Sequence, residues 1–283
     1  AVTSGTIPPG MSPILQDKTV SLGGVPSKIG HYVSTVQLVL RNAKGKVVVS
    51  GTSLTFDITV TSLENAVGTF NGWIYNSQYG NGAATITVSP VGQITGKLSL
   101  RGTNYTLKAS SFSGMTNECC LLSATVSASP KGNTIPITLT LSKEGDAAAS
   151  LDNDPEAEWR LARSLSTADL AAVIKPMVGT YVLPPEFLAS GPLNGCTAQL
   201  LVSSKGQGIF TSKLGSRMAL QSSYPVLILT DRGAATYRSL VVVYGPLSSS
   251  KDSSSGVFGL FEIVEKLAPD TFTLQEVIPL GTW

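Results

Sequence analysis

Catalysis by a serine hydrolase mechanism would depend on His31, because His31 is the sole histidine in the sequence. In a Ser-His-Asp triad the imidazole takes the proton of the serine hydroxyl. No G-x-S-x-G segment, which would present such a serine on a sharp turn, accompanies His31. We therefore predict that His31 is not catalytic.

Carboxylate pairs are the second candidate for chemistry. A retaining glycosidase needs two carboxyl groups about 5–5.5 Å apart, and the candidate pairs are Asp57 with Glu64 and Glu262 with Glu265. Glu262 and Glu265 are three positions apart on an expected strand, so their side chains would point to opposite faces. We interpret these acids as solvated strand residues and predict that the chain is not an enzyme.

Asp152, Asp154 and Glu156 stand at alternate positions, as oxygen ligands do at the start of a calcium-binding loop. Counting from Asp152, however, Ala157 replaces the turn glycine and Arg163 replaces the distal glutamate. Helix capping explains Asp154 without a metal. We expect no metal and no other cofactor.

Trp73, Tyr75 and Tyr79 share one parity, so an unbroken strand would place their rings on one face. An exposed row of this kind could stack on the rings of a carbohydrate. The alternative is a buried core face, which we favour because large aromatic side chains are highly buried on average. The turn-rich segment 76–82 could also break the register before Tyr79.

The three cysteines are Cys119, Cys120 and Cys196. Adjacent residues of a strand point to opposite faces, so at most one of the first two can pack inward. A disulfide from either of them to Cys196 would leave one thiol over. That thiol could be buried or could link subunits, and no Cys or His spacing suggests zinc.

The composition favours a β protein outside the cell. Charged residues make up 13% of the chain, apolar residues 42%, and the net charge is +2. This is about half the usual share of charge, and Ser, Thr, Gly and Asn take its place. Lys and Arg are scattered rather than arranged in a stripe that could follow a phosphate backbone, so we expect no nucleic-acid partner. No apolar run approaches the ~18 residues that span a bilayer.

The chain starts at Ala1 rather than at Met, with no positively charged segment before it. A boundary chosen for cloning is one explanation. We favour a mature end left by signal-peptide cleavage, which predicts a secreted protein, extracellular or at the cell surface.

The N-terminal part of the sequence divides into an arm and a β region. Residues 1–17 are rich in proline and show no periodic pattern, which predicts an extended arm. The apolar positions of this arm are Ile7, Met11, Ile14 and Leu15. Residues 18–66 are expected to form a β region that packs with the first repeat. Its expected strands are 32–40, 46–50 and 54–61, with a hairpin turn at 42–45.

The same order of strands and turns occurs twice in the chain. Val67-Gly68-Thr69-Phe70 returns as Val178-Gly179-Thr180-Tyr181, and Ile94-Thr95-Gly96-Lys97-Leu98 returns as Phe210-Thr211-Ser212-Lys213-Leu214. Each copy reads as four strands joined by loops and glycine turns, which predicts an antiparallel meander. The predicted domains are a first β repeat over 67–142 and a second over 178–283, which includes a C-terminal strand.

Residues 143–177 are predicted to be a linker with short helices. The first helix would open at Asp154, which can cap free amides, with Pro155 at the first helical position. The second would begin at Ser166 and end near Pro176. Within the second repeat, residues 248–255 are expected to be a hairpin loop.

The segment Thr-Ile-Thr-Val-Ser-Pro-Val-Gly-Gln-Ile-Thr-Gly-Lys-Leu over 85–98, with Gly-Thr-Phe/Tyr before it in each copy, resembles β-rich repeats in large secreted and surface proteins of environmental bacteria. The resemblance covers residues 67–265 and consists mainly of turn glycines and strand residues. It implies a surface location and an adhesive or structural role. It brings no active-site residues, and two units are fewer than the long arrays of such proteins.

Either end of the chain could add a strand to the sheet of a neighbouring subunit. The C-terminal segment 271–279 includes an alternating strand, and the arm over 1–17 is extended and apolar. For the C-terminal segment we favour pairing within its own chain. For the arm the sequence leaves both outcomes open.

These patterns predict an all-β protein of two diverged tandem antiparallel β units, each a sandwich or a barrel, with an N-terminal β region and one short helical linker. The predicted function is that of an extracellular structural protein, a self-assembling bacterial surface or filament subunit whose partners are copies of itself. The alternative is a cell-surface adhesin or carbohydrate-binding module that contacts surface glycans.

Overall fold

The fold was analysed in a computed structural model of the chain. It describes residues 1–282 apart from 17–18, 25, 62–66, 76–79, 110–113, 116–118, 129–133, 143–145, 152–157, 231–236, 248–255 and 266–271. Between residues 109 and 159 it describes the backbone of the strands and not the side chains. The chain divides into unit 1, residues 1–67 and 88–93, and unit 2, residues 68–87 and 94–283. No helix in the described ranges is long and apolar enough to cross a membrane.

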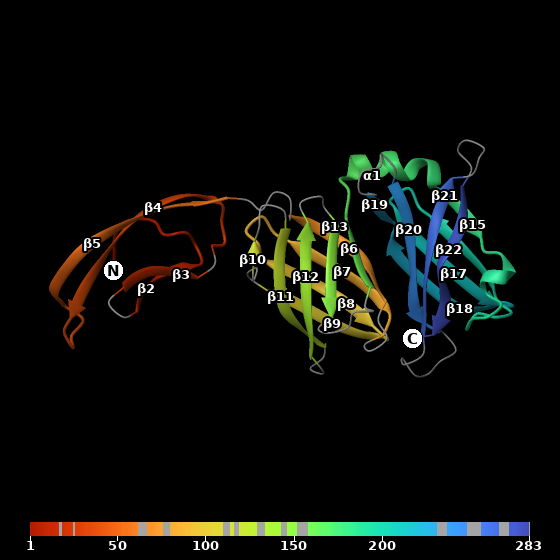
Figure 1. The fold of residues 1–283 in the computed structure, drawn as a ribbon, viewed down its shortest axis with the longest axis horizontal. Helices are drawn as coiled ribbons and strands as arrows, with labels where there is room; N and C mark the ends of the chain where they lie inside the picture. The colour runs from red at the N-terminus through yellow and green to blue at the C-terminus, as the bar shows by residue number, and fades with distance from the viewer. Residues whose placement is uncertain are drawn as a thin grey trace. The chain divides into compact units, whose positions relative to one another are not determined.

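Unit 1 contains two small antiparallel sheets (Figure 1). The three-stranded sheet has the order β1-β4-β5, and the other is the β2–β3 hairpin. Its strands are β1 (Val2–Gly5), β2 (Met11–Gln16), β3 (Thr19–Gly24), β4 (Gly30–Arg41) and β5 (Val47–Val60). The turn between β4 and β5 is held by the Asn42 side chain, whose Oδ1 accepts hydrogen bonds from the Lys44 and Lys46 amides at 3.0 Å. The predicted hairpin is therefore confirmed, although 46–50 and 54–61 belong to one continuous strand.

The segment predicted as an arm, residues 1–17, pairs within its own chain, which is one of the two outcomes that the sequence leaves open. β1 pairs with β4 and β2 pairs with β3, and the Ala1 ammonium donates a hydrogen bond to the Gln37 carbonyl at 2.7 Å. The arm turns at Gly10, where φ is +91°, a conformation that glycine adopts without strain. Pairing within the chain satisfies backbone groups that an extended arm would leave to water.

The first part of unit 2 is a nine-stranded antiparallel sheet. Because β9 also pairs with β11, strands β11–β14 and β6–β9 together form one closed ring. We call this the closed sheet. Its strands are β6 (Gly68–Tyr75), β7 (Gly82–Val88), β8 (Ile94–Leu100), β9 (Thr103–Ala109), β10 (Gly114–Met115), β11 (Cys119–Ala128), β12 (Thr134–Ser142), β13 (Asp146–Leu151) and β14 (Glu158–Arg163). Buried side chains on its inner face include Phe70, Ile74, Ile86, Leu98 and Leu107.

The helix predicted to open at Asp154 and the linker predicted before it are wrong. Residues 146–151 form β13 and residues 158–163 form β14, which pairs with β6 on its other side. Helical propensity is a weak prior that tertiary context overrides, and here β14 completes the ring of strands. Leu161 and Ala162 are both buried, on opposite faces of β14. Asp154 itself lies outside the described residues.

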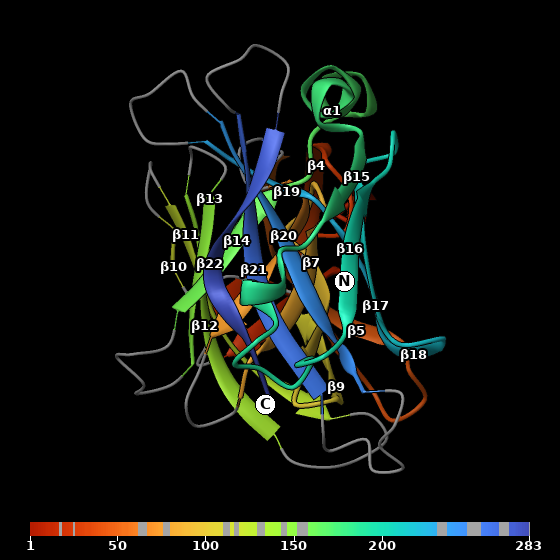
Figure 2. The same ribbon diagram turned by 90° about the vertical axis from the view of Figure 1, so that its right-hand side faces the viewer.

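The second part of unit 2 is a sandwich of two four-stranded antiparallel sheets, with the orders β15-β16-β17-β18 and β19-β20-β21-β22. Its elements are α1 (Thr167–Ile174), η1 (Lys175–Met177), β15 (Gly179–Val182), η2 (Pro185–Phe187), β16 (Thr197–Val202), β17 (Gln207–Leu214), β18 (Arg217–Pro225), β19 (Leu227–Thr230), β20 (Tyr237–Pro246), β21 (Gly256–Glu265) and β22 (Phe272–Thr282). Figure 2 shows the two layers, with α1 at one end. Buried side chains from both sheets, among them Leu200, Phe210, Val241 and Phe261, form its core.

Two further predictions for the sandwich can be compared with the structure. The helix at Ser166 is confirmed, because the Ser166 Oγ accepts a hydrogen bond from the Asp169 amide at the start of α1. β22 pairs with β21 of its own chain, as favoured for the C-terminal segment. The predicted loop at 248–255 lies outside the described residues.

The meander predicted for each repeat is present in the same strand order, as β6–β9 in the closed sheet and β15–β18 in the sandwich. The turns at 89–93 and 203–207 have the same hydrogen bonds. In each turn the serine Oγ accepts a hydrogen bond from the backbone amide of the glutamine, at 3.0 Å in the first turn and 3.1 Å in the second. The backbone amide of the glycine donates a hydrogen bond to the serine carbonyl at 2.9 Å in both turns. The turn glycines have φ values of +78° and +72°. The repeated sequence pattern therefore specifies a repeated local structure.

The closed sheet and the sandwich share a hydrophobic cluster within unit 2. Trp73, Ala83 and Ala162 of the closed sheet pack with buried side chains of β19–β21. The β19–β21 members are Leu227, Leu240, Val242, Tyr244, Phe258 and Leu260. The Tyr244 hydroxyl also accepts a hydrogen bond from the Gly102 amide at 2.9 Å. Unit 2 is therefore one packed body rather than two separate β units.

Candidate functional site

The three-stranded sheet of unit 1 carries an unusual number of exposed apolar side chains. Among the described residues of 1–67, Val36 is, apart from the ring of Pro8, the one aliphatic or aromatic side chain that is buried. The exposed ones on the sheet are Val2, Val33, Leu38, Leu40, Val47, Val48, Val49 and Leu54. We call these eight residues the apolar face set; because Val47, Val48 and Val49 are consecutive on β5, its members lie on both faces of the sheet. Large exposed apolar surface on a soluble monomer commonly marks an interaction site.

β5 is an edge strand of this sheet, with one side left unpaired among the described residues. It is 14 residues long, and Asp57 is its sole charged residue. Natural sheets usually protect an exposed edge with charged residues, proline or a short strand. Because β5 has little of this protection, its free backbone groups can pair with another strand.

His31 and Asp57 form an ion pair across β4 and β5, with 2.6 Å between Nε2 and Oδ1. Both side chains are exposed, and in the described part of the chain neither has another side-chain partner. The pair holds two strands together. It lacks the hydroxyl nucleophile and the buried carboxylate that a Ser-His-Asp triad requires.

Of the three aromatic residues that the sequence places on one face, the structure describes Trp73 and Tyr75, which both lie on β6. Trp73 is 3% exposed and lies in the shared hydrophobic cluster, where a sugar cannot reach it. Tyr75 is 45% exposed and contacts the Phe258 ring at 6.5 Å between centroids. Tyr79 lies outside the described residues. The burial of Trp73 under the sandwich fits the buried face that the sequence analysis favours, whereas Tyr75 remains half exposed.

The remaining candidates for chemistry do not converge. Cys196 is a free, partly buried thiol, so it forms no disulfide with Cys119 or Cys120, which lie on β11. Glu262 is held by Arg238 through two hydrogen bonds of 3.0 and 2.8 Å. Within the described ranges, no group of three His, Cys, Asp or Glu side chains could hold a metal ion. Glu64 and the acids of the expected calcium loop lie outside these ranges.

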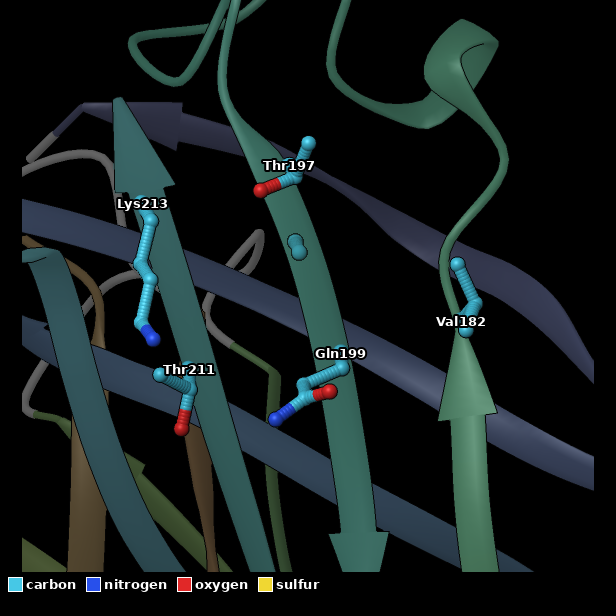
Figure 3. Close-up of a pocket in the computed structure, with 6 residues that line it drawn as sticks. Val182, Thr197, Gln199, Thr211 and Lys213 are labelled. Atoms are coloured by element: carbon cyan, nitrogen blue, oxygen red, sulfur yellow. The ribbon is translucent and has the colours of Figure 1, made fainter. Parts of the chain in front are cut away.

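Figure 3 shows a shallow hollow of about 220 Å³ on the outer face of the sandwich. Thr197 and Gln199 of β16, Thr211 and Lys213 of β17, and Val182 of β15 line it. The Lys213 ammonium and the Gln199 amide both extend toward Thr211 (Figure 3). These groups can donate hydrogen bonds to a ligand, and none of them is a general base at neutral pH.

A second hollow, of about 360 Å³, lies at the matching place on the first meander. Thr95 and Lys97 line it, and these two residues align with Thr211 and Lys213 of the first hollow. The sheet around it carries a polar network in which the Thr85 hydroxyl donates to Asn71 Oδ1 and Asn71 Nδ2 donates to Ser164 Oγ, both at 2.8 Å. The repeat therefore places a matching Thr and Lys beside each hollow, although the two hollows have different volumes and the second is lined mainly by apolar atoms.

Comparisons with known proteins assign no family. No protein-family model matches the chain. No curated protein matches it either. A crystal structure described as that of a "putative outer membrane protein" from Bacteroides fragilis matches with 14% sequence identity and a TM-score of 0.24, over 77% of this chain and 96% of that chain. At this TM-score the likeness carries no argument about fold, location or function.

Proposed function

We propose that this chain is an extracellular structural protein, a self-assembling surface or filament subunit that binds copies of itself through unit 1. The observation that carries the proposal is the apolar face set beside the unprotected edge of β5. The low charge and the polar strand residues support an extracellular setting. The proposal assigns no catalytic activity, cofactor or nucleic-acid partner to the chain.

The energetics of unit 1 favour a covering partner. Ordering one backbone residue costs about 1–2 kcal/mol, and full burial of a Val or Leu side chain recovers about 1.5–3 kcal/mol. With Val36 and the ring of Pro8 as the buried apolar side chains described in 1–67, the sheet recovers little of that cost by itself. Covering the apolar face set would supply the missing burial.

A second copy of the chain fits the β5 edge. Two β5 strands can pair antiparallel, with Val47 of one copy opposite Val60 of the other, and Asp57 then lies opposite Ser50 rather than another acid. Backbone hydrogen bonds along both strands would replace those made to water. The exposed Ile14 and Leu15 of β2 offer a second contact, through which assembly can extend beyond a dimer.

The test compares assembly of the full-length chain and two variants by light scattering coupled to size exclusion and by negative-stain electron microscopy. The double variant Val48→Lys/Val49→Lys places two charges on the exposed part of β5, and lysines on an edge strand oppose strand addition. The matched control is Val182→Lys, because Val182 is 77% exposed on a strand of unit 2.

We expect the unmodified chain and the Val182→Lys control to form dimers and larger assemblies, and the β5 variant to remain monomeric at the same concentrations. Circular dichroism in the aromatic region, which reports the buried Trp73 in unit 2, controls for folding. A monomeric unmodified chain at all concentrations would overturn the proposal. So would assembly of the β5 variant that equals that of the control.

A further inference from the structure

Unit 2 contains a cleft of about 400 Å³ between the β8–β9 hairpin of the closed sheet and strands β18 and β20 of the sandwich. The closed sheet contributes Ser99, Gly102 and Asn104. The sandwich contributes Gln221, Ser222, Ser223, Tyr224, Tyr244, Gly245 and Pro246. The volume lies within the range of small-molecule sites. The lining is therefore polar and aromatic, although consecutive residues of β18 alternate in direction, so that Tyr224 and Gln221 point to opposite sides of that strand.

Buried contacts hold the walls of this cleft in place. The Tyr244 hydroxyl accepts a hydrogen bond from the Gly102 amide at 2.9 Å, which ties the two walls together. The buried Ser222 hydroxyl accepts one from the Tyr244 amide at 3.0 Å. The Tyr224 ring lies edge-on to the Tyr244 ring, with 6.1 Å between centroids. The cleft is thus shaped before any ligand arrives, which lowers the entropic cost of binding.

The polar groups at the rim suit a ligand that both donates and accepts hydrogen bonds. The Ser99 hydroxyl donates to Asn104 Oδ1 at 2.5 Å, so the Asn104 amide nitrogen keeps its two donors for a ligand. Gln221 and Ser223 are exposed on β18 beside it. Each carboxamide and each hydroxyl offers both a donor and an acceptor, as every sugar hydroxyl does.

The charge and the aromatic content of the cleft limit the chemical class of ligand that it can bind. Its lining contains no Lys, Arg, Asp or Glu side chain, so no group there would pair with an ionised ligand. Tyr224 is half-buried and supplies an apolar ring face, and Pro246 adds a second apolar surface. Burial raises the pKa of Tyr224 to about 12, so its hydroxyl remains a hydrogen-bond donor at physiological pH.

We propose that this cleft binds a neutral sugar residue of a glycan, with the Asn104 carboxamide hydrogen-bonded to ring hydroxyls and Tyr224 against an apolar face of the sugar ring. All of the lining residues belong to unit 2, so the site is independent of assembly through unit 1. It also differs from the row of Trp73, Tyr75 and Tyr79 that the sequence indicates.

The test is binding of the full-length chain to an array of neutral oligosaccharides built from glucose, N-acetylglucosamine, xylose, mannose and galactose, with uronic acid oligomers as charged competitors. The strongest neutral oligosaccharide is then titrated by calorimetry. The variant is Asn104→Ala, which removes from the cleft the carboxamide whose nitrogen offers two hydrogen-bond donors. The matched control is Gln199→Ala, an exposed carboxamide in the hollow of Figure 3.

We expect a neutral oligosaccharide to bind, and we expect the cleft variant to raise its dissociation constant about tenfold, the effect of losing two hydrogen bonds. Tyr224→Phe, which keeps the ring, should weaken binding less than Tyr224→Ala. Failure of every neutral glycan to bind would overturn the proposal. So would preference for the uronic acids, or equal affinity of the cleft variant and the Gln199→Ala control.

Discussion

At the scale of single residues, Tyr224 and Tyr244 bind their hydroxyl protons more tightly in the folded chain than an exposed tyrosine does. Burial raises the pKa of Tyr224 from 10.0 to about 12. Burial also raises the pKa of Tyr244, against the opposing effect of the hydrogen bond from Gly102. A raised folded-state pKa contributes stability below the unfolded pKa, and that contribution is lost as the pH rises through the folded pKa.

We therefore predict that unit 2 loses stability between pH 10 and about pH 12. Tyr224 alone should account for about 2–3 kcal/mol of this loss. Urea unfolding followed at pH 9, 10, 11 and 12 measures it, with Tyr224→Phe as the variant that should flatten the profile. The exposed Tyr75 provides the control, Tyr75→Phe. A profile unchanged by Tyr224→Phe would contradict the prediction.

At the scale of elements, the contact between β6 and β14 joins the two runs of strands, β6–β9 and β11–β14, within the closed sheet. A Cβ on Gly72 of β6 would lie 1.8 Å from the Arg160 carbonyl oxygen of β14, and backbone cannot move away as the end of a flexible side chain can. Only a residue without a side chain fits at this crossing. Gly179 on β15 has no atom within 4 Å of the same position.

Gly72→Ala is predicted to destabilise unit 2 by about 3 kcal/mol or more, because β14 must separate from β6 to admit the methyl group. Gly179→Ala, on an open strand, should change the free energy of unfolding by less than about 0.5 kcal/mol. Chemical denaturation of both variants measures the difference. Equal stability of the two variants would show that the sheet does not depend on this close contact.

The elements that sequence could predict are those specified by local patterns. The hairpin at Asn42, the helix at Ser166 and the two meanders each follow from turn residues and strand alternation within a short window. β13 and β14 could not be predicted, because their strand conformation depends on partners elsewhere in the sheet. For the same reason the sequence could not decide how residues 1–17 pair, since the partner strand β4 lies beyond the next hairpin.

The cleft of unit 2 could not be predicted from sequence either. Asn104 and Tyr224 belong to different repeats, and no spacing rule joins them. They meet because the shared cluster around Trp73 docks the sandwich on the closed sheet. Tyr224 and Tyr244 were the available signal of this cleft in the sequence, but they lie on two strands whose pairing had to be known first.

At the scale of the whole molecule, the two units differ in how much they bury. Unit 2 has two large buried clusters in addition to the interior of the closed sheet. Apart from the ring of Pro8, residues 1–67 have one buried aliphatic side chain among those described. Local opening needs little free energy where few apolar contacts are lost. Unit 1 should therefore open far more often than unit 2 in an isolated copy.

Hydrogen exchange of the full-length chain tests this difference. In dilute monomer, the amides of β4 and β5 should exchange at least about a hundredfold faster than those of β8 and β17, which corresponds to about 2.7 kcal/mol. In the assembled state the β4 and β5 amides should become protected. Equal protection of all four strands in the monomer would mean that unit 1 is stable without a partner.

The cleft has one more consequence, which follows from the origin of its two walls. Residues 99–104 and residues 221–246 come together only when both halves of unit 2 have folded and docked. A sugar bound there would brace the two halves, and by thermodynamic reciprocity it would resist their separation with the same free energy that docking contributes to its binding. When a copy is bound to a glycan and pulled by flow, its unit 2 would therefore resist unfolding more than in the unbound state.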